Sequence, residues 1–130
     1  MERDRQQDAR LPHVGLISGV GGFPLALRAV SRPVALCEID IDACRVLRRR
    51  FPGVPLWTDI RTLRGHDVPP FELLTAGFPC QDLSVAGRKR GLREGHHSCL
   101  LWEVMRLLAE VERPPSYVLL ENVPSVVRDL

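Results

Sequence analysis

Short apolar runs alternate along this chain with segments of helical spacing. A short apolar run bounded by turn residues is typical of a strand that is buried on both faces of a sheet. Five such runs occur, at residues 14–18, 34–37, 54–57, 71–76 and 117–120. Strands that alternate with helices pair in parallel through right-handed crossovers. The pattern therefore predicts an α/β fold with a five-stranded parallel sheet.

Three segments have helical spacing, at residues 23–30, 41–51 and 99–111. Asp40 or Asp42 is placed to cap the start of the second helix. Pro33 is expected to end the first helix, because proline interrupts helical hydrogen bonding. The stretch from 78 to 97 is rich in Gly, Arg and Ser and follows neither period, so we predict a loop there.

Chain length and net charge limit the number of domains and the kinds of partner that the protein can have. The 130 residues fit one domain, and we predict a flexible segment over residues 1–12 followed by a single domain over 13–130. The formal net charge of +2 is too small to indicate a nucleic-acid partner by itself. The polar start does not resemble a signal peptide, and no apolar run approaches membrane-spanning length. We therefore expect a cytoplasmic protein with no membrane partner.

The four cysteines do not form a Cys-x-x-Cys pair, so neither a zinc knuckle nor a redox dithiol is predicted. His96 and His97 are adjacent and have no third ligand at metal spacing, so we predict no metal site. Three cysteines lie on apolar faces and are assigned to the core: Cys37, Cys44 and Cys99.

Cys80 differs from these three because it follows a proline in the predicted loop. A nucleophilic cysteine needs thiolate character, which nearby positive groups favour. Four basic residues of the same loop either supply that charge, contact phosphates, or form a solvated surface: Arg88, Lys89, Arg90 and Arg93. Glu121 directly follows an apolar strand, where packing does not call for a carboxylate.

The remaining polar candidates also follow predicted strands. Gly19, Gly21 and Gly22 follow the first strand, Glu38 the second and Asp59 the third. In a parallel sheet these positions share the carboxyl edge, where ligands bind. Glu38 comes nineteen residues after Gly19, like the acid that binds ribose hydroxyls in nucleotide folds. A glycine-rich turn that only joins strand to helix is the alternative.

These segments together resemble the DNA cytosine-5 methyltransferase family. The resemblance rests on five motifs in the family's order: Ile17-Ser18-Gly19-Val20-Gly21-Gly22-Phe23, Glu38-Ile39-Asp40, Asp59-Ile60, Gly77-Phe78-Pro79-Cys80-Gln81 with Ser84, and Glu121-Asn122-Val123. A nucleotide-dependent oxidoreductase would explain the glycine loop and Glu38, but not the motifs around Cys80 and Glu121.

The resemblance implies a Rossmann-like methyltransferase fold of strand order 3-2-1-4-5, with S-adenosyl-L-methionine as methyl donor and double-stranded DNA as substrate. The implied cofactor-binding residues are Ser18, Gly19, Val20, Gly21, Gly22, Phe23, Glu38, Ile39, Asp59 and Ile60. The implied catalytic residues are Cys80, Glu121, Pro79 and Asn122, and the DNA-binding residues are Gln81, Ser84, Arg88, Lys89 and Arg90. Cys80 would attack C6 of a flipped-out cytosine, and Glu121 would bind its amine and N3. A bacterial or phage origin is expected.

The family continues beyond this point with a further arginine motif, a target recognition region and a final antiparallel strand pair. We therefore expect this chain to be a truncated or split amino-terminal part of the catalytic domain that is inactive alone. Either a second chain supplies the remainder, as in a split enzyme, or the gene is a truncated remnant. Apolar side chains that the missing part would cover should be exposed. Two alternatives stay open: a non-catalytic module that binds S-adenosylmethionine or DNA, and a relative that methylates tRNA.

Overall fold

The computed structural model describes residues 8–78 and 98–122. Its elements are β1 (Leu11–Leu16), α1 (Gly22–Ala26), β2 (Ser31–Cys37), α2 (Ile41–Arg50), β3 (Leu56–Trp57), the 3-10 helix η1 (Gly65–Asp67), β4 (Leu73–Gly77), α3 (Ser98–Glu110) and β5 (Tyr117–Glu121). The strands pair in parallel in the order β3-β2-β1-β4-β5. This confirms the predicted sheet and its strand order.

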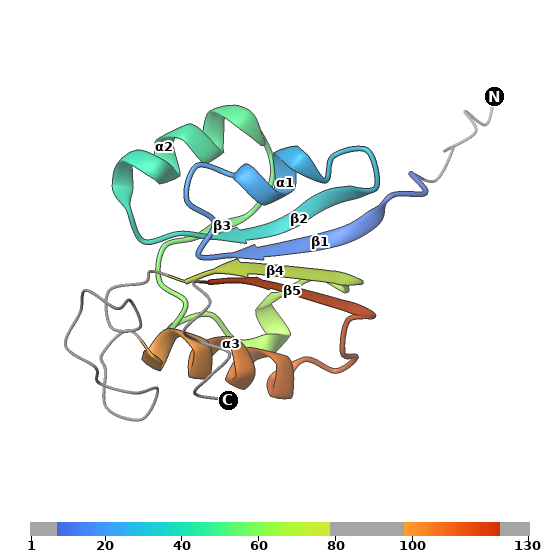
Figure 1. Ribbon diagram of the computed structural model, residues 1–130, viewed down its shortest axis with the longest axis vertical. Coiled ribbons are helices and arrows are strands. Elements are labelled where there is room, and N and C mark those ends of the chain that lie inside the picture. The colour runs from blue at the N-terminus through green and yellow to red at the C-terminus, as the bar shows by residue number, and fades with distance from the viewer. Residues whose placement is uncertain (1–7, 79–97, 123–130) are drawn as a thin grey trace.

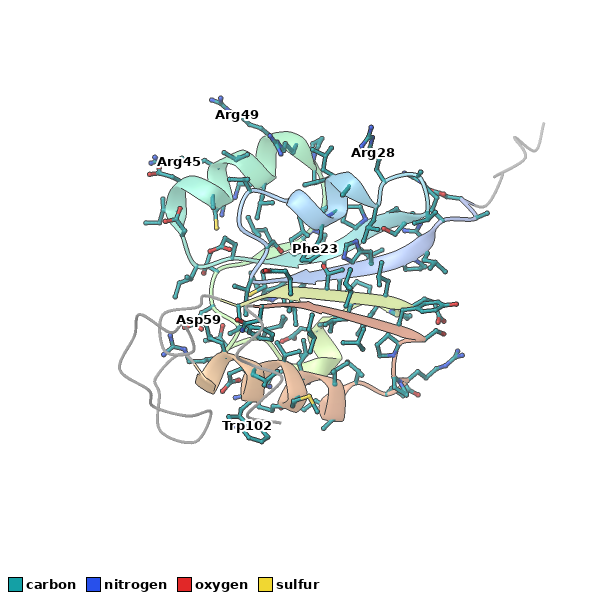
Figure 2. The ribbon with its side chains drawn as sticks, in the orientation of Figure 1. Phe23, Arg28, Arg45, Arg49, Asp59 and Trp102 are labelled. Carbon is teal, nitrogen blue, oxygen red and sulfur yellow. The ribbon has the colours of Figure 1, made fainter. Side chains whose placement is uncertain are left out.

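The sheet lies between two helical layers. Helices α1 and α2 cover one face and α3 covers the other, as Figure 1 shows. The apolar core on the α3 side is formed by alternate residues of the central strands and by the inner face of the helix: Val14, Leu16, Leu74, Ala76, Val104 and Leu107. On the outer side of each layer, Arg45 and Arg49 of α2 and Trp102 of α3 project away from the sheet (Figure 2). No helix in the described ranges is long and apolar enough to cross a membrane.

The first strand begins at Leu11 and ends at Leu16, so the predicted domain boundary at residue 13 falls inside β1. The prediction that Pro33 ends a helix reaching residue 30 was wrong. Helix α1 ends at Ala26, and Pro33 lies within β2. The register of β1 on β2 shifts at this point, from His13↔Pro33 to Val14↔Ala35. Because proline has no N–H to donate, a strand accommodates it at such an irregularity.

Helix α2 follows its predicted pattern closely. Asp40 is the N-cap, and its side chain accepts a hydrogen bond from the Ala43 N–H at 2.8 Å. Arginines occupy the last turn of α2, where positive charge interacts favourably with the helix dipole. The choice between Asp40 and Asp42 is therefore settled, since Asp42 lies in the first turn and pairs with Arg45 at 2.7 Å.

A buried polar cluster lies on the opposite face of the central strands. His13 Nε2 is 2.7 Å from Thr75 Oγ1, and His13 Nδ1 is 3.3 Å from Ser31 Oγ. The Ser31 hydroxyl donates to the Leu27 carbonyl at 3.2 Å, so Nδ1–H donates to Ser31 and Nε2 accepts from Thr75. Both hydrogen bonds of the His13 ring are thus satisfied when the imidazole is neutral. Burial lowers the pKa of His13 from 6.5 to about 4.

We expect the free energy of unfolding to decrease as the pH is lowered from 7 to 5. Between pH 6.5 and about 4 the unfolded chain takes up a proton at His13 while the folded chain does not. The linkage relation for one such group gives a loss of about 2 kcal/mol between pH 7 and pH 5. Urea unfolding at both pH values measures it. His13→Asn, which cannot titrate, should remove that part of the pH dependence, and an unchanged dependence would contradict the assignment.

Helix η1, which the sequence pattern did not predict, packs against the end of α3. Gly65 N–H donates to Glu110 Oε2 at 2.9 Å. A Cβ at Gly65 would lie 2.5 Å from the Glu110 carbonyl carbon and 2.7 Å from its Cβ. Only glycine therefore allows these two backbone segments to approach so closely.

Gly65→Ala should lower the free energy of unfolding by about 1–3 kcal/mol, because backbone atoms must move to admit the methyl group. Gly22→Ala is the matched control, since a Cβ at Gly22 meets nothing within 4 Å. Chemical denaturation of both variants measures the difference. Equal stability of the two variants would show that η1 and α3 separate without cost.

Strand β5 exposes apolar side chains at the edge of the sheet. Tyr117, Val118, Leu119 and Leu120 are 60%, 45%, 42% and 43% exposed, respectively. Four consecutive apolar residues on an edge strand form a surface that proteins ordinarily cover. The expectation of exposed apolar side chains next to the fifth strand is confirmed.

Candidate functional site

The ends of the first three strands surround a hollow at the carboxyl edge of the sheet. The hollow is small, with a cavity volume of about 40 Å³. Pockets that enclose a whole small molecule measure roughly 300–1,000 Å³, so this hollow could hold only part of such a ligand. Asp59 lies at this edge, on the left in Figure 2, where the strand arrows of Figure 1 end. The lining residues come from the ends of β1 and β2, the turn after β3 and the first half of α3: Ile17, Cys37, Glu38, Ile39, Asp59, Ile60, Arg61 and Leu100.

The turn between β1 and α1 has a left-handed backbone at three positions. Ile17, Gly19 and Gly21 have φ values of 52°, 54° and 88°. A β-branched residue rarely adopts this conformation, and strain of this kind is commonly found at ligand sites. Gly21 is required for a second reason, because a Cβ there would lie 2.7 Å from Cε2 of Phe51. The turn therefore depends on packing against the end of α2.

Ser18 folds back over the end of β1. Its hydroxyl donates to the Gly15 carbonyl at 2.8 Å, and its N–H donates to the Cys37 carbonyl at 3.1 Å. A Cβ at Gly15 would lie 2.9 Å from both Ser18 Oγ and Leu36 Cδ2. The absence of a side chain at Gly15 thus makes room for Ser18, a role that the sequence pattern did not indicate.

Glu38 connects the ends of the first two strands. Its Oε2 accepts from the Gly19 N–H at 2.6 Å and its Oε1 from the Asp40 N–H at 2.9 Å. The residue is only 7% exposed. Each carboxylate oxygen can accept more than one hydrogen bond, so the carboxylate can hold the backbone and still accept from a ligand hydroxyl. The structure brings the predicted residues Gly19 and Glu38 into direct contact.

Asp59 and Ile60 form the wall that comes from β3. Asp59 Oδ1 accepts from the Arg61 N–H at 2.9 Å and lies 3.3 Å from Arg61 Nε. Ile60 is buried and packs into the core under α3. Both predicted residues line the same hollow as Glu38 and Ile39.

Cys37 also lines the hollow, although we predicted it as a core residue. It is buried, as is Cys44, so the core assignment of both is confirmed. Burial, assisted by the nearby charge of Glu38, raises the pKa of Cys37 to about 12. The thiol is therefore protonated at neutral pH and suits a packing role. In the described part of the chain, no three His, Cys, Asp or Glu side chains gather as a metal site.

The second part of the edge is formed where β4 and β5 end side by side. Gly77 pairs with Glu121, and the Phe78 N–H donates to the Glu121 carbonyl at 3.2 Å. A Cβ at Gly77 would lie 3.5 Å from Glu121 Oε2 and 3.9 Å from Cε2 of Phe23. The Glu121 carboxylate thus lies over the end of β4, close to the predicted glycine-loop residue Phe23. Asn122 follows it and is half-buried.

The predicted residues between β4 and α3 lie outside the described ranges. They are Pro79, Cys80, Gln81, Ser84, Arg88, Lys89 and Arg90. Their assignments stay predictions. Arg61 and Leu100 line the hollow but were not predicted as site residues. The position of Leu100 on the apolar face of its predicted helix could have indicated that it faces the sheet.

Comparisons with known proteins match nearly the whole described chain. The family model for C-5 cytosine-specific DNA methylases matches residues 12–129. Type II methyltransferase M2.BsuMI of Bacillus subtilis (strain 168) is 42% identical over 119 residues, covering 88% of this chain and 30% of the relative. Type II methyltransferase M.AluI of Cellulosimicrobium cellulans is 36% identical over 132 residues, covering 92% of this chain and 24% of the relative.

Solved structures agree with the sequence matches. The S. pombe Dnmt2 methyltransferase superposes with a TM-score of 0.72 and 25% identity, covering 92% of this chain and 38% of that chain. A putative DNA modification methyltransferase from an E. coli prophage gives a TM-score of 0.70 and 28% identity, covering 89% of this chain and 33% of that chain. The chain therefore spans between 24% and 38% of the length of these four proteins.

Glu38→Gln should lower the free energy of unfolding by about 1–3 kcal/mol. An amide presents one acceptor oxygen, so one of the two backbone N–H groups would lose its partner and face an NH₂ group instead. Asp42→Asn is the matched control, because the Asp42 side chain is 85% exposed and makes only a surface ion pair. Chemical denaturation of both variants provides the measurement, and a Glu38→Gln chain as stable as the control would refute the bridging role.

Proposed function

This chain belongs to the C-5 cytosine-specific DNA methylase family, and we propose that it supplies the cofactor-binding and nucleophile-bearing part of a DNA cytosine-5 methyltransferase. The observation that carries the proposal is the shared edge. The hollow at Glu38 lies at the ends of β1, β2 and β3, and the carboxylate of Glu121 lies at the ends of β4 and β5, so both are on the carboxyl edge of one parallel sheet. Transfer of a group between two ligands requires that the site for the group's donor and the site for its acceptor lie close together, as two sites on one sheet edge do.

The residues around the hollow fit S-adenosylmethionine by their chemistry. The Glu38 carboxylate keeps acceptor capacity for ribose hydroxyls, and Ile39 beside it offers an apolar wall. Asp59 and Ile60 would bind the adenine edge and ring. The glycine turn from Ser18 to Phe23, including Val20, Gly21 and Gly22, would border the methionine part. The bound cofactor supplies the methyl group, and this chain's residues orient it toward the end of β4.

Cys80 is proposed as the nucleophile. Phe78 is hydrogen-bonded to Glu121. Cys80 follows Phe78 by two residues, so chain geometry limits the separation of their Cα atoms to about 7.6 Å at most. Its thiolate would form a bond to C6 of cytosine, which moves the C5–C6 electron pair and makes C5 nucleophilic. After methylation of C5, loss of the C5 proton to a base and expulsion of the thiolate would restore the ring.

Glu121 is proposed to bind the exocyclic amine and N3 of the flipped base, which stabilises the electron-rich adduct. Its exposed carboxylate beside the side-chain-free Gly77 suits a group that meets a ligand. Pro79 and Asn122 would shape this part of the site. The loop residues Gln81, Ser84, Arg88, Lys89 and Arg90 would contact the DNA around the flipped base.

A second chain is proposed to complete the enzyme. This chain spans at most 38% of the compared proteins, and β5 presents four exposed apolar side chains at the sheet edge. Both observations favour a role as one part of an assembly. The alternative is a module that binds S-adenosylmethionine or DNA without turnover, and a tRNA substrate is the other alternative to duplex DNA.

We expect titration calorimetry to detect binding of S-adenosylmethionine to the 130-residue chain. Ile39→Ala should weaken it several-fold by removing apolar contact area. Val30→Ala is the control, because Ile39 and Val30 are both exposed (63% and 57%), but Val30 precedes β2 at the amino edge of the sheet and only Ile39 lines the hollow at Glu38. The proposed cofactor site would be rejected if the unsubstituted chain did not bind S-adenosylmethionine, or if both variants lost affinity equally.

In the same preparation, transfer of labelled methyl to duplex DNA should be negligible without a second chain. Transfer by this chain alone that disappears in Cys80→Ala would support the chemistry and reject the need for a partner. RNA in place of DNA tests the tRNA alternative directly. If the chain binds the cofactor but transfers no methyl group even when a second chain that carries the remaining part of the enzyme is added, the non-catalytic module is favoured.

A further inference from the structure

The Arg106 side chain of α3 makes four hydrogen bonds, each to a different residue. Its Nη2 donates to the carbonyl of Ile60 at 2.9 Å and to that of Leu63 at 3.0 Å. Its Nε donates to Glu103 at 2.6 Å, and its Nη1 donates to Glu110 at 2.7 Å. The side chain is only 24% exposed. These bonds connect helix α3 to the turn that follows β3.

That turn has four hydrogen bonds of its own. The Asp59 side chain accepts from the Arg61 N–H at 2.9 Å, and the Asp59 carbonyl accepts from the Thr62 hydroxyl at 2.9 Å. The Thr62 N–H donates to the Asp59 carbonyl at 3.1 Å, and the Leu63 N–H donates to the Ile60 carbonyl at 3.3 Å. Strand β3 consists of Leu56 and Trp57 alone, so the sheet holds this segment over two residues. The buried side chains of Ile60 and Leu63 also anchor the turn in the core. The two hydrogen bonds from Arg106 add a polar contact that connects the backbone of the turn to α3.

The two carboxylates orient the guanidinium toward the turn. Glu103 and Glu110 lie one turn before and one turn after Arg106 on the same helix, and each accepts from a different nitrogen. With these nitrogens engaged, Nη2 faces the two carbonyls. Lysine has a single ammonium group without this planar arrangement of donors, so it cannot make the same four contacts.

We propose that Arg106 is a positioning residue for the cofactor site, and this inference rests on the proposed function. Asp59 and Ile60, which the guanidinium holds through the turn, form the adenine side of the hollow. Leu100 of the same helix lines that hollow as well. One helix thus contributes a lining residue of the site and the contact that holds the turn bearing Asp59 and Ile60. Arg106 itself touches no ligand in this proposal.

Hydrogen exchange and calorimetry on Arg106→Lys test the proposal. Amide exchange at Thr62 and Leu63 should become about tenfold faster, and the dissociation constant for S-adenosylmethionine should rise by a similar factor, because one hydrogen bond to a charged group is worth about that much. Both measurements are made well below the melting temperature, and protection of β1 amides should stay unchanged. A residue that only stabilised the fold would not weaken binding under these conditions.

Two control variants separate the contributions. Arg45→Lys changes an arginine that pairs only with Asp42 on the exposed face of α2, and it should alter neither measurement. Glu103→Gln removes one ion pair of Arg106 but leaves its contacts to the two carbonyls, so it should change exchange at Thr62 and Leu63 far less than Arg106→Lys does.

The outcomes distinguish this inference from the proposed function. Unchanged exchange at Thr62 and Leu63 in Arg106→Lys would overturn the contact to the turn. Faster exchange with unchanged affinity would show that Arg106 supports the fold alone and would overturn its positioning role. Failure of the unsubstituted chain to bind S-adenosylmethionine would overturn the proposed cofactor site, and the positioning role with it.

Discussion

The site depends on one carboxylate that accepts two backbone hydrogen bonds. Glu38 bonds to Gly19 in the turn after β1 and to Asp40 at the start of α2. Asp40 in turn caps α2 through the Ala43 N–H. The glycine turn, the end of β2 and the first turn of α2 are therefore held together by a single buried charge. Backbone N–H groups compensate that charge, since a buried carboxylate without hydrogen bonds would be strongly unfavourable.

The part of the hollow that follows β3 is held by a cation. Arg106 fixes the turn after β3 through two carbonyls, while Glu103 and Glu110 neutralise its charge. The two anchors lie on different faces of the sheet, because Glu38 bonds to the α1 and α2 layer and Arg106 belongs to α3. Short strands and turns alone would leave the walls of the hollow free to move. Charged groups bonded to backbone atoms give those walls fixed positions.

The exposed strand β5 relates the site to the rest of the enzyme. Glu121 lies at the end of this strand, so whatever covers Tyr117–Glu121 also determines the surroundings of the proposed base-binding carboxylate. Burial of the apolar side chains of β5 would contribute favourable free energy to association. Assembly and formation of a complete active site are therefore coupled in the proposed split enzyme.

The sequence by itself determined the alternation of elements, the parallel sheet, a helix cap at Asp40 or Asp42, and the spacing of nineteen residues between Gly19 and Glu38. Each of these follows from local periodicity or from a spacing along the chain. Only the tertiary structure decided that Pro33 lies within a strand, that Gly65 must lack a side chain, and that Arg106 bonds to the turn after β3. Gly65 meets Glu110, and Arg106 meets Ile60, more than forty residues away. A local pattern carries no information about such contacts, because they arise from how the folded layers pack.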